Sequence, residues 1–122
     1  MCGIAGFTSF RSRPDAYRDI LERMTRVLQH RGPDGEGFYR DDAISMGHRR
    51  LAIIDAAGGA QPMSSPDGRF QVAYNGEVYN YLELRKELET RGEVFRTQSD
   101  TEVMLRLFTL EGARALERFD GM

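Results

Sequence analysis

The apolar and polar positions at the start of the chain predict a strand followed by an amphipathic helix. Residues 2–10 predict a strand, and its two glycines allow another backbone or a ligand to come close. From Asp15 onward, apolar residues recur at helical spacing and form one stripe: Tyr17, Ile20, Leu21, Met24, Val27 and Leu28. Gly32 is the expected C-terminal cap of this helix, and Pro33 prevents its continuation.

The middle of the chain predicts strands and loops. Residues 38–40 and 43–47 predict two strands around a polar turn. Residues 48–55 begin with basic residues and become strongly β-forming, which predicts a further strand with Arg50 near its start. Residues 56–69 are rich in Gly, Pro and Ser and predict a long surface loop.

The remaining pattern predicts two strands and two helices. Strands are expected at residues 70–74 and 93–96, and helices from residue 80 to about 90 and from residue 99 to about 110. A capping pair is expected at each helix start, Asn80 with Glu83 and Ser99 with Glu102. Because helices and strands mix without a βαβ alternation, we expect an α+β fold with a mostly antiparallel sheet and helices packed on its face.

Composition and charge exclude several classes of function. The 122 residues suit a single domain, and 17 Lys and Arg against 19 Asp and Glu give no electrostatic reason to expect nucleic acid or an acidic membrane surface. One cysteine excludes an internal disulfide framework, and the two histidines lack ligand spacing, so no metal site is expected. Without an apolar run of about 18 residues or a signal peptide, a cytoplasmic protein is the default expectation.

The only cysteine, Cys2, directly follows the initiator Met1. A buried structural thiol in a first strand is the simpler interpretation, since free cysteines are commonly buried. The alternative requires removal of Met1, which leaves one residue with both a thiol and a free α-amino group. Such an amino group is partly unprotonated near neutral pH, so it can accept the proton of the thiol without a histidine.

Three further features each allow a structural and a chemical interpretation. Asn75-Gly76 is a strong hairpin signal, or an oxyanion hole made by a side-chain amide and a backbone N–H. Asp100 suits the first turn of a helix, or binds an ammonium group. Arg50 is an exposed edge residue, or a fork that binds a carboxylate. Taken together, the chemical interpretations suit an α-amino acid with an attackable side-chain carbonyl.

Six motifs give the chain a resemblance to a known family. They occur in the family's order along almost the whole chain: MCGIAGF at 1–7, RGPDG at 31–35, HRRLAIID at 48–55, QPM at 61–63, YNGEVYN at 74–80 and SDTEV at 99–103. The chain resembles the N-terminal glutaminase domain of asparagine synthetases, which are class II glutamine amidotransferases and N-terminal-nucleophile hydrolases. Relatives that make sugars or purines carry a Trp-Ala-Thr-His type run after the arginine, where this chain has Leu51-Ala52-Ile53-Ile54.

The resemblance implies a role for each site residue and a fold. Cys2 would be the nucleophile after removal of Met1, and Asn75 with Gly76 would form the oxyanion hole. Arg50 would bind the α-carboxylate of glutamine and Asp100 its α-amino group. The implied fold is a four-layer αββα sandwich of mostly antiparallel sheets. The remaining pocket would be lined, largely through backbone groups, by Leu51, Ile53 and Glu77.

The resemblance also implies partners outside these residues. Residues 1–122 are expected to be an incomplete glutaminase domain that needs no cofactor of its own, followed in the full protein by a synthetase domain that uses ATP and Mg²⁺. The Ser-Gly-Gly-rich pyrophosphate loop of that domain does not occur here. Three alternatives stay open: a different ammonia acceptor, such as a sugar or a peptide carboxylate; a non-catalytic domain that regulates a synthetase; and a homodimer as the assembly.

Overall fold

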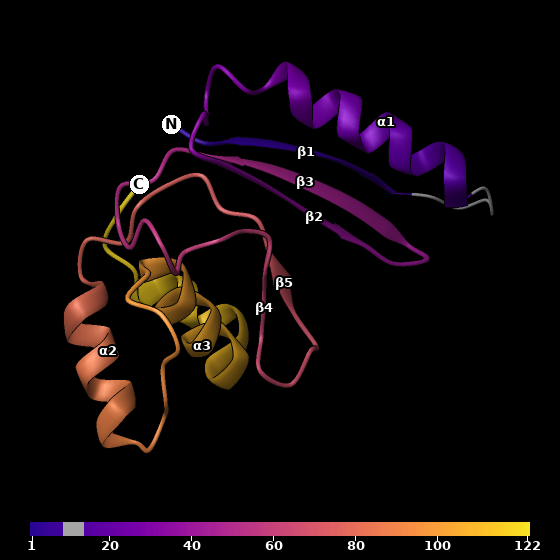
Figure 1. The fold of residues 1–122 in the computed structure, drawn as a ribbon. Coiled ribbons are helices and arrows are strands. Elements are labelled where there is room, and N and C mark those ends of the chain that lie inside the picture. The colour runs from indigo at the N-terminus through magenta and orange to yellow at the C-terminus, as the bar shows by residue number, and fades with distance from the viewer. Residues whose placement is uncertain (9–13) are drawn as a thin grey trace.

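The computed structural model describes residues 1–8 and 14–122, which form two small antiparallel sheets and a group of helices (Figure 1). The elements in chain order are β1 (Gly3–Thr8), α1 (Pro14–Val27), β2 (Gly35–Arg40), β3 (Ile44–Arg50), β4 (Met63–Ser64), β5 (Gln71–Val72), α2 (Tyr81–Thr90), α3 (Asp100–Glu111) and the 3-10 helix η1 (Gly112–Arg118). The predicted α+β class with antiparallel pairing is confirmed. Positions 9 and 10 of the predicted first strand lie outside the described residues.

The larger sheet has the strand order β1-β3-β2, and both pairings are antiparallel. Gly3 pairs with Arg49, so the residue before β1, Cys2, lies beside the residues that end β3. In the turn between β2 and β3, the Asp41 carboxylate accepts the backbone N–H groups of Ala43 and Ile44, both at 2.8 Å. That turn keeps the hairpin in register.

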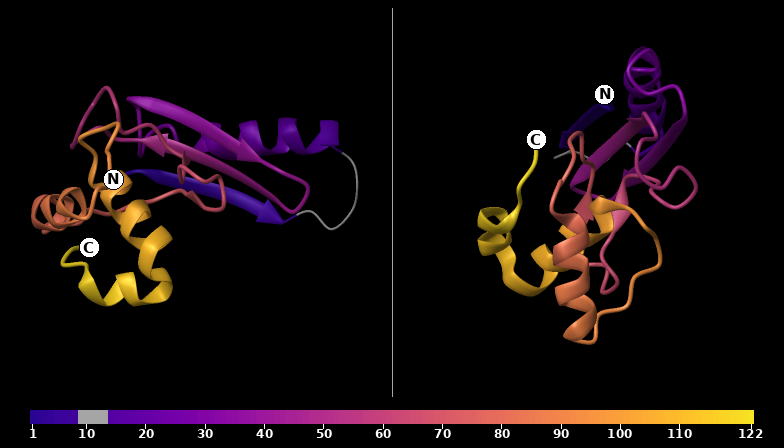
Figure 2. Two further views of the ribbon diagram at one scale, coloured as in Figure 1. Left: turned by 90° about the horizontal axis from the view of Figure 1, so that it is seen from below. Right: turned by 90° about the vertical axis from the view of Figure 1, so that its left-hand side faces the viewer.

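Helix α1 covers one face of this sheet (Figures 1 and 2). Leu21 and Thr25 face the strands and are almost fully buried. The Thr25 hydroxyl donates to the Leu21 carbonyl at 2.8 Å and lies directly over Gly47. A Cβ at Gly47 would collide with that hydroxyl, so the helix packs this close only because β3 has a glycine there.

The predicted apolar stripe of α1 is only partly buried. Leu21 is 3% exposed, whereas Val27 is 73% exposed and Ile20 and Met24 are also exposed. The helix ends at Val27, and Gly32 is not its left-handed cap. A Cβ at Gly32 would strike the Arg49 backbone, so close packing explains this glycine.

The predicted strand at residues 48–55 is wrong in its second half. Strand β3 ends at Arg50, which therefore closes a strand instead of starting one. The backbone N–H of Leu51 donates to the Cys2 sulfur and that of Ala52 to Asp34, so neither is available to a sheet partner. Asp55 has a φ of 49°, which also breaks an extended run.

The second half of the chain departs from the predicted loops and caps in three places. The loop predicted at 56–69 contains β4, which pairs with β5. The Asn80 side chain does not cap α2 but binds the backbone of Arg118 and Asp120. Residues 93–96 are not a strand; instead, the backbone N–H groups of Arg96 and Thr97 donate to the buried carboxylate of Glu102.

Of the capping pair predicted at the start of α3, Ser99 and Glu102, only Ser99 acts as predicted. Ser99 is the N-cap, and its hydroxyl accepts the N–H of Thr101 at 3.2 Å. Glu102 does not return a bond to Ser99, because its oxygens are taken by the preceding loop. Asp100 lies in the first turn of the helix, as predicted.

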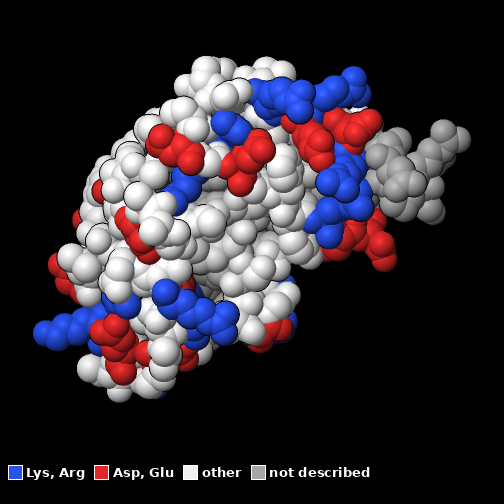
Figure 3. Space-filling view, in the orientation of Figure 1, with Lys and Arg blue, Asp and Glu red and all other residues white. Residues whose placement is uncertain are grey.

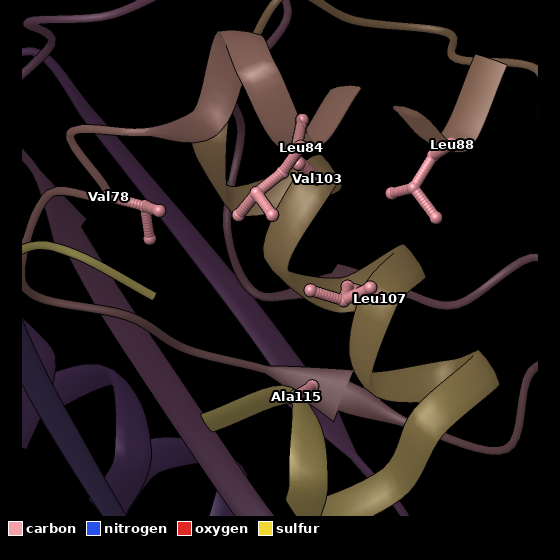
Figure 4. Packing of buried hydrophobic residues seen from close by; sticks show 6 residues of the cluster. All are labelled: Val78, Leu84, Leu88, Val103, Leu107 and Ala115. Atoms are coloured by element: carbon pink, nitrogen blue, oxygen red, sulfur yellow. The ribbon is translucent and has the colours of Figure 1, made fainter. Parts of the chain in front are cut away.

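The main hydrophobic core lies among α2, α3 and η1 (Figure 4). Leu88, Val103 and Leu107 have no exposed surface. Burying a side chain of this size contributes about 1.5–3 kcal/mol. This core fixes the start of α3 relative to the segment before α2, which Val78 anchors by packing into the same cluster.

The surface carries charges of both signs. In Figure 3, acidic side chains lie beside the basic ones over the face shown. Among the described residues, no helix is long and apolar enough to cross a membrane.

Candidate active site

One cavity of about 180 Å³ lies between the end of the larger sheet and the start of α3. It collects residues from six separate stretches of the chain. The eight residues that the sequence singled out all line it: Cys2, Arg50, Leu51, Ile53, Asn75, Gly76, Glu77 and Asp100. Tertiary folding therefore brings all of them to one place, although Cys2 and Asp100 are 98 positions apart in the sequence.

Cys2 directly precedes β1, and its side chain is half-buried. Its sulfur accepts the backbone N–H of Leu51 at 3.4 Å and lies 3.8 Å from the Leu51 carbonyl oxygen. Arg31 donates from Nε to the Cys2 carbonyl at 3.0 Å and so holds the backbone of the same residue. These contacts orient the thiol from the side chain and from the backbone of the same residue.

Arg50 is held by the loop that follows it. Its Nη1 donates to the Ala56 carbonyl at 2.9 Å, and its Nη2 donates to the carbonyls of Ile54 and Asp55 at 2.8 and 2.6 Å. Gly59 lies so close that any Cβ there would strike the guanidinium. Among the described residues these bonds use three of the five N–H donors, so two remain for a ligand.

Asn75 and Gly76 are not a two-residue hairpin turn. The type I′ turn of that signal needs a positive φ at both residues, and neither has one. Both line the cavity, and neither the Asn75 amide nor the Gly76 N–H has a partner among the described residues. A Cβ at Gly76 would meet the Tyr74 ring and the Met122 carbonyl, so only glycine fits. Two unpaired donors at a cavity are the requirement of an oxyanion hole.

Asp100 is a buried carboxylate with 6% exposure. Its Oδ2 accepts the backbone N–H of Val78 at 3.0 Å, and its Oδ1 accepts that of Thr101 at 2.8 Å. The hydroxyls of Ser99 and Thr101 lie 3.4 Å from Oδ1. Neutral donors, and no cation among the described residues, compensate this buried charge, which leaves its negative potential directed at the cavity.

The carboxylates around the cavity affect the pKa of a neighbouring tyrosine, Tyr74. Burial, followed by the charges of Asp100 and Glu77, raises the pKa of Tyr74 to about 12. The Tyr74 hydroxyl therefore stays protonated and donates to the Met122 carbonyl at 3.0 Å. Arg50 lines the same cavity. A cation and carboxylates in one cavity complement the two charges of an α-amino acid.

The other three predicted lining residues contribute in different ways. Leu51 presents its backbone N–H and carbonyl to the Cys2 sulfur. Glu77 has both its backbone groups bonded to Met122, each at 3.0 Å, so its backbone is not free for a ligand. Ile53 lines the cavity although its side chain is 71% exposed.

Two buried polar residues beside the cavity have partners that the sequence did not indicate. The Gln61 amide bridges the backbone of Tyr74 and the hydroxyl of Thr101. His48 donates from Nε2 to the Tyr74 carbonyl at 3.1 Å, while its Nδ1 has no partner among the described residues. Burial lowers the pKa of His48, so the ring is neutral. The QPM motif marks Gln61 in the sequence, but nothing local identifies its partners.

A family model described as a glutamine amidotransferase domain matches residues 1–122. The chain belongs to this family. The chain is 40% identical over 126 residues to a glutamine-hydrolysing asparagine synthetase 1 of Bacillus subtilis (strain 168), and the match covers 100% of this chain and 20% of that protein.

Relatives from plants and other bacteria give the same picture. The chain is 39% identical over 122 residues to a glutamine-hydrolysing asparagine synthetase 1 of Arabidopsis thaliana, covering 100% of the chain and 20% of that protein. It is 37% identical over 122 residues to asparagine synthetase B of Escherichia coli (strain K12), covering 100% of the chain and 22% of that protein. The chain thus spans about a fifth of the length of these curated relatives.

Proposed function

We propose that these residues form the glutaminase part of an asparagine-synthesising enzyme, which hydrolyses glutamine to glutamate and ammonia. One observation carries the proposal: a thiol, two unpaired oxyanion donors, a cation and a buried carboxylate line the same cavity. In this assignment Arg50 binds the α-carboxylate and Asp100 the α-amino group, which leaves the side-chain amide directed at Cys2. The names of the relatives favour aspartate over a sugar as the final acceptor of ammonia.

The proposed reaction uses the N-terminal amino group as its base. After removal of Met1, the α-amino nitrogen of Cys2 accepts the thiol proton, and the thiolate attacks the amide carbon of glutamine. The resulting oxyanion receives hydrogen bonds from the Asn75 amide and the Gly76 N–H. The C–N bond then breaks, the proton passes to the leaving nitrogen, and ammonia departs. Water hydrolyses the γ-glutamyl thioester and restores the thiol.

Met1 determines whether this base exists. With Met1 attached, the nitrogen of Cys2 is an amide and cannot accept a proton. Met1 lines the cavity and is 60% exposed, which makes it accessible to an aminopeptidase. The proposed active species therefore begins at Cys2.

We assign the fold to the four-layer αββα sandwich implied by the resemblance, with residues 1–122 as its incomplete first part. The sheet face opposite α1 supports this assignment. Its positions on β1 are Ile4, Gly6 and Thr8, and all three are exposed. A sandwich would cover this face with a second sheet packed about 10 Å away.

ATP and Mg²⁺ would be bound outside these residues. The sequence has no Ser-Gly-Gly-rich pyrophosphate loop, and the described residues contain no group of three His, Cys, Asp or Glu side chains able to hold a metal. The role proposed for this chain is the supply of ammonia alone.

The test is the substitution Cys2→Ala in the full-length gene product. Glutamate release from glutamine should disappear, because no other described residue offers a thiol. Asparagine formation from free ammonia should persist, since that step would not use Cys2. Glutamate release at the unsubstituted rate would show that the nucleophile assignment is wrong.

A matched test addresses Met1. Mass spectrometry of the purified protein should find Cys2 as the first residue of the active fraction. A variant with Ala inserted before Cys2 keeps the thiol but removes the free amino group, so it should hydrolyse glutamine no better than Cys2→Ala. Full activity in a protein that retains Met1 would contradict the proposed base.

A further inference from the structure

The segment from Tyr74 to Val78 carries Asn75 and Gly76, and both of its ends are bound to the first turn of α3. At one end, the Val78 N–H donates directly to Asp100 at 3.0 Å. At the other end, the Tyr74 N–H donates at 2.5 Å to the Gln61 amide oxygen, and Gln61 contacts Thr101 in turn. The oxyanion donors therefore lie between two attachments to the same helix start.

The hydrogen bonds from Tyr74 through Gln61 and Thr101 to Asp100 have donors and acceptors that chemistry assigns without ambiguity. A backbone N–H can only donate, so the oxygen of the Gln61 amide must face Tyr74 and its nitrogen must face Thr101. The Gln61 nitrogen then donates to the Thr101 hydroxyl at 3.3 Å. That leaves the Thr101 hydroxyl proton for Asp100, whose Oδ1 is 3.4 Å away. The series begins at the segment with the oxyanion donors and ends on the Asp100 carboxylate.

Burial makes this connection rigid and costly to break. Gln61 is 8% exposed, Thr101 2% and Asp100 6%. A buried polar group that loses its partner is destabilising, because it has no water to replace the lost hydrogen bond. The Gln61 backbone is also fixed, because its carbonyl lies against Gly37 of β2 so closely that a Cβ there would overlap it.

We infer that Gln61 is a positioning residue that couples recognition of the substrate's α-amino group at Asp100 to the alignment of the oxyanion donors at Asn75 and Gly76. The inference rests on the proposed function. An ammonium group that binds Asp100 restrains the carboxylate, and Thr101 and Gln61 transmit that restraint to Tyr74. An amide that lacks the α-amino group would leave the segment less constrained, so the coupling contributes to selection of α-amino acids.

The test compares Gln61→Met with Gln29→Met in the full-length gene product. Both substitutions exchange an amide for a thioether of similar length, but Gln29 is exposed and outside the cavity. With L-glutamine, Gln61→Met should lower kcat on the order of tenfold to a hundredfold, less than or equal to the loss of one oxyanion donor. Gln29→Met should match the unsubstituted protein.

Two readouts separate positioning from general damage. The first readout is the ratio of two kcat values, one for L-glutamine and one for the analogue of glutamine that lacks only the α-amino group. This ratio should fall in Gln61→Met, because the coupling is lost. Alkylation of Cys2 by iodoacetamide, which needs neither Asp100 nor the oxyanion donors, should keep its rate. An unchanged kcat ratio, or a parallel loss of alkylation, would overturn the inference.

Thr101 supplies the second pair of variants. Thr101→Val removes the hydroxyl at nearly constant volume and should reproduce the effects of Gln61→Met. Thr101→Ser keeps the hydroxyl and should retain the kcat and the kcat ratio of the unsubstituted protein. The double variant Gln61→Met with Thr101→Val should be no worse than either single variant, because both break one connection. Fully additive losses would overturn the coupling.

The outcomes also distinguish this inference from the function on which it rests. If the unsubstituted full-length protein releases no glutamate from glutamine, the proposed function fails. If it releases glutamate while Gln61→Met and Thr101→Val both retain the full kcat and the full kcat ratio, the function stands and the positioning role fails.

Discussion

The two halves of the molecule on either side of the cavity are stabilised in different ways. In the sheet half, made of α1 and β1–β3, the fully buried side chains are the polar Thr25, Ser45 and His48. In the helical half, made of α2, α3 and η1, they are mostly apolar: Leu88, Val103 and Leu107, with Thr101 as the polar exception. The helical half relies on apolar burial, whereas the sheet half relies on close backbone packing.

This difference has a geometric cause. Strand β1 directly follows Cys2, and its glycines lie against neighbours with no room for a side chain: Gly3 against Leu28 and Gly6 against the Ser45 carbonyl. Close packing of this kind fixes a backbone within a fraction of an ångström, because interiors are nearly incompressible. The backbone of the sheet half, which carries the thiol, is therefore held more closely by its neighbours. The helical half, which carries Asp100, has the larger apolar core.

The largest effect is expected from Leu88→Ala in α2. Leu88 has no exposed surface, so the truncation should lower the free energy of unfolding of the chain by about 3 kcal/mol, within the usual range of 2–5. The control is Leu82→Ala in the same helix, where the side chain is 60% exposed. Urea unfolding measures both, and equal losses would mean that the helical half has no specific core.

The next effect is expected from Gly47→Ala, which adds one methyl group to β3. The new Cβ would overlap the Thr25 hydroxyl, and overpacking of this kind costs about 1–3 kcal/mol. Thr25→Ala in the same chain should recover part of the loss by removing that hydroxyl. Gly35→Ala is the control, since its Cβ would lie at an ordinary 3.8 Å from Arg50. Equal melting temperatures for both glycine variants would refute the close-packing account of the sheet half.

The smallest effect is a pH dependence that belongs to the sheet half. Burial lowers the pKa of His48, the Tyr74 carbonyl opposes this and the charge of Arg50 adds to it. Because the folded pKa lies below the unfolded value of about 6.5, stability is complete above that pH and decreases as the pH falls, by up to about 1.4 kcal/mol per pH unit.

A variant isolates the contribution of His48. His48→Gln keeps an N–H donor for the Tyr74 carbonyl but cannot take up a proton in this range. Urea unfolding between pH 7 and pH 5.5, above the range where carboxylates titrate, should therefore give a flatter profile for His48→Gln than for the unsubstituted chain. Identical slopes would show that His48 is not the titrating group.

The predictable part of this molecule is local. Helix α1 follows from the spacing of its apolar residues, and the Ser99 cap and the Asp100 position follow from the sequence at the start of α3. The two failed helix caps share one cause: the side chain bound a group outside its own helix instead of the start of that helix. Asn80 binds Arg118 and Asp120, and Glu102 binds the preceding loop.

By itself, the sequence determined the family and the α+β class, and it named eight of the residues that line the cavity, because residue types in ordered motifs carry that information. Their roles in glutamine hydrolysis stay predictions. Only the tertiary structure decided that Cys2 lies against Leu51, that Arg50 is held by the loop after β3, and that Gln61 connects Tyr74 to Thr101. The bonds of Cys2 and Gln61 join residues far apart in the sequence, so the packing of the whole chain chooses their partners. The Arg50 bonds are local, but they require the loop after β3 to fold back over the guanidinium.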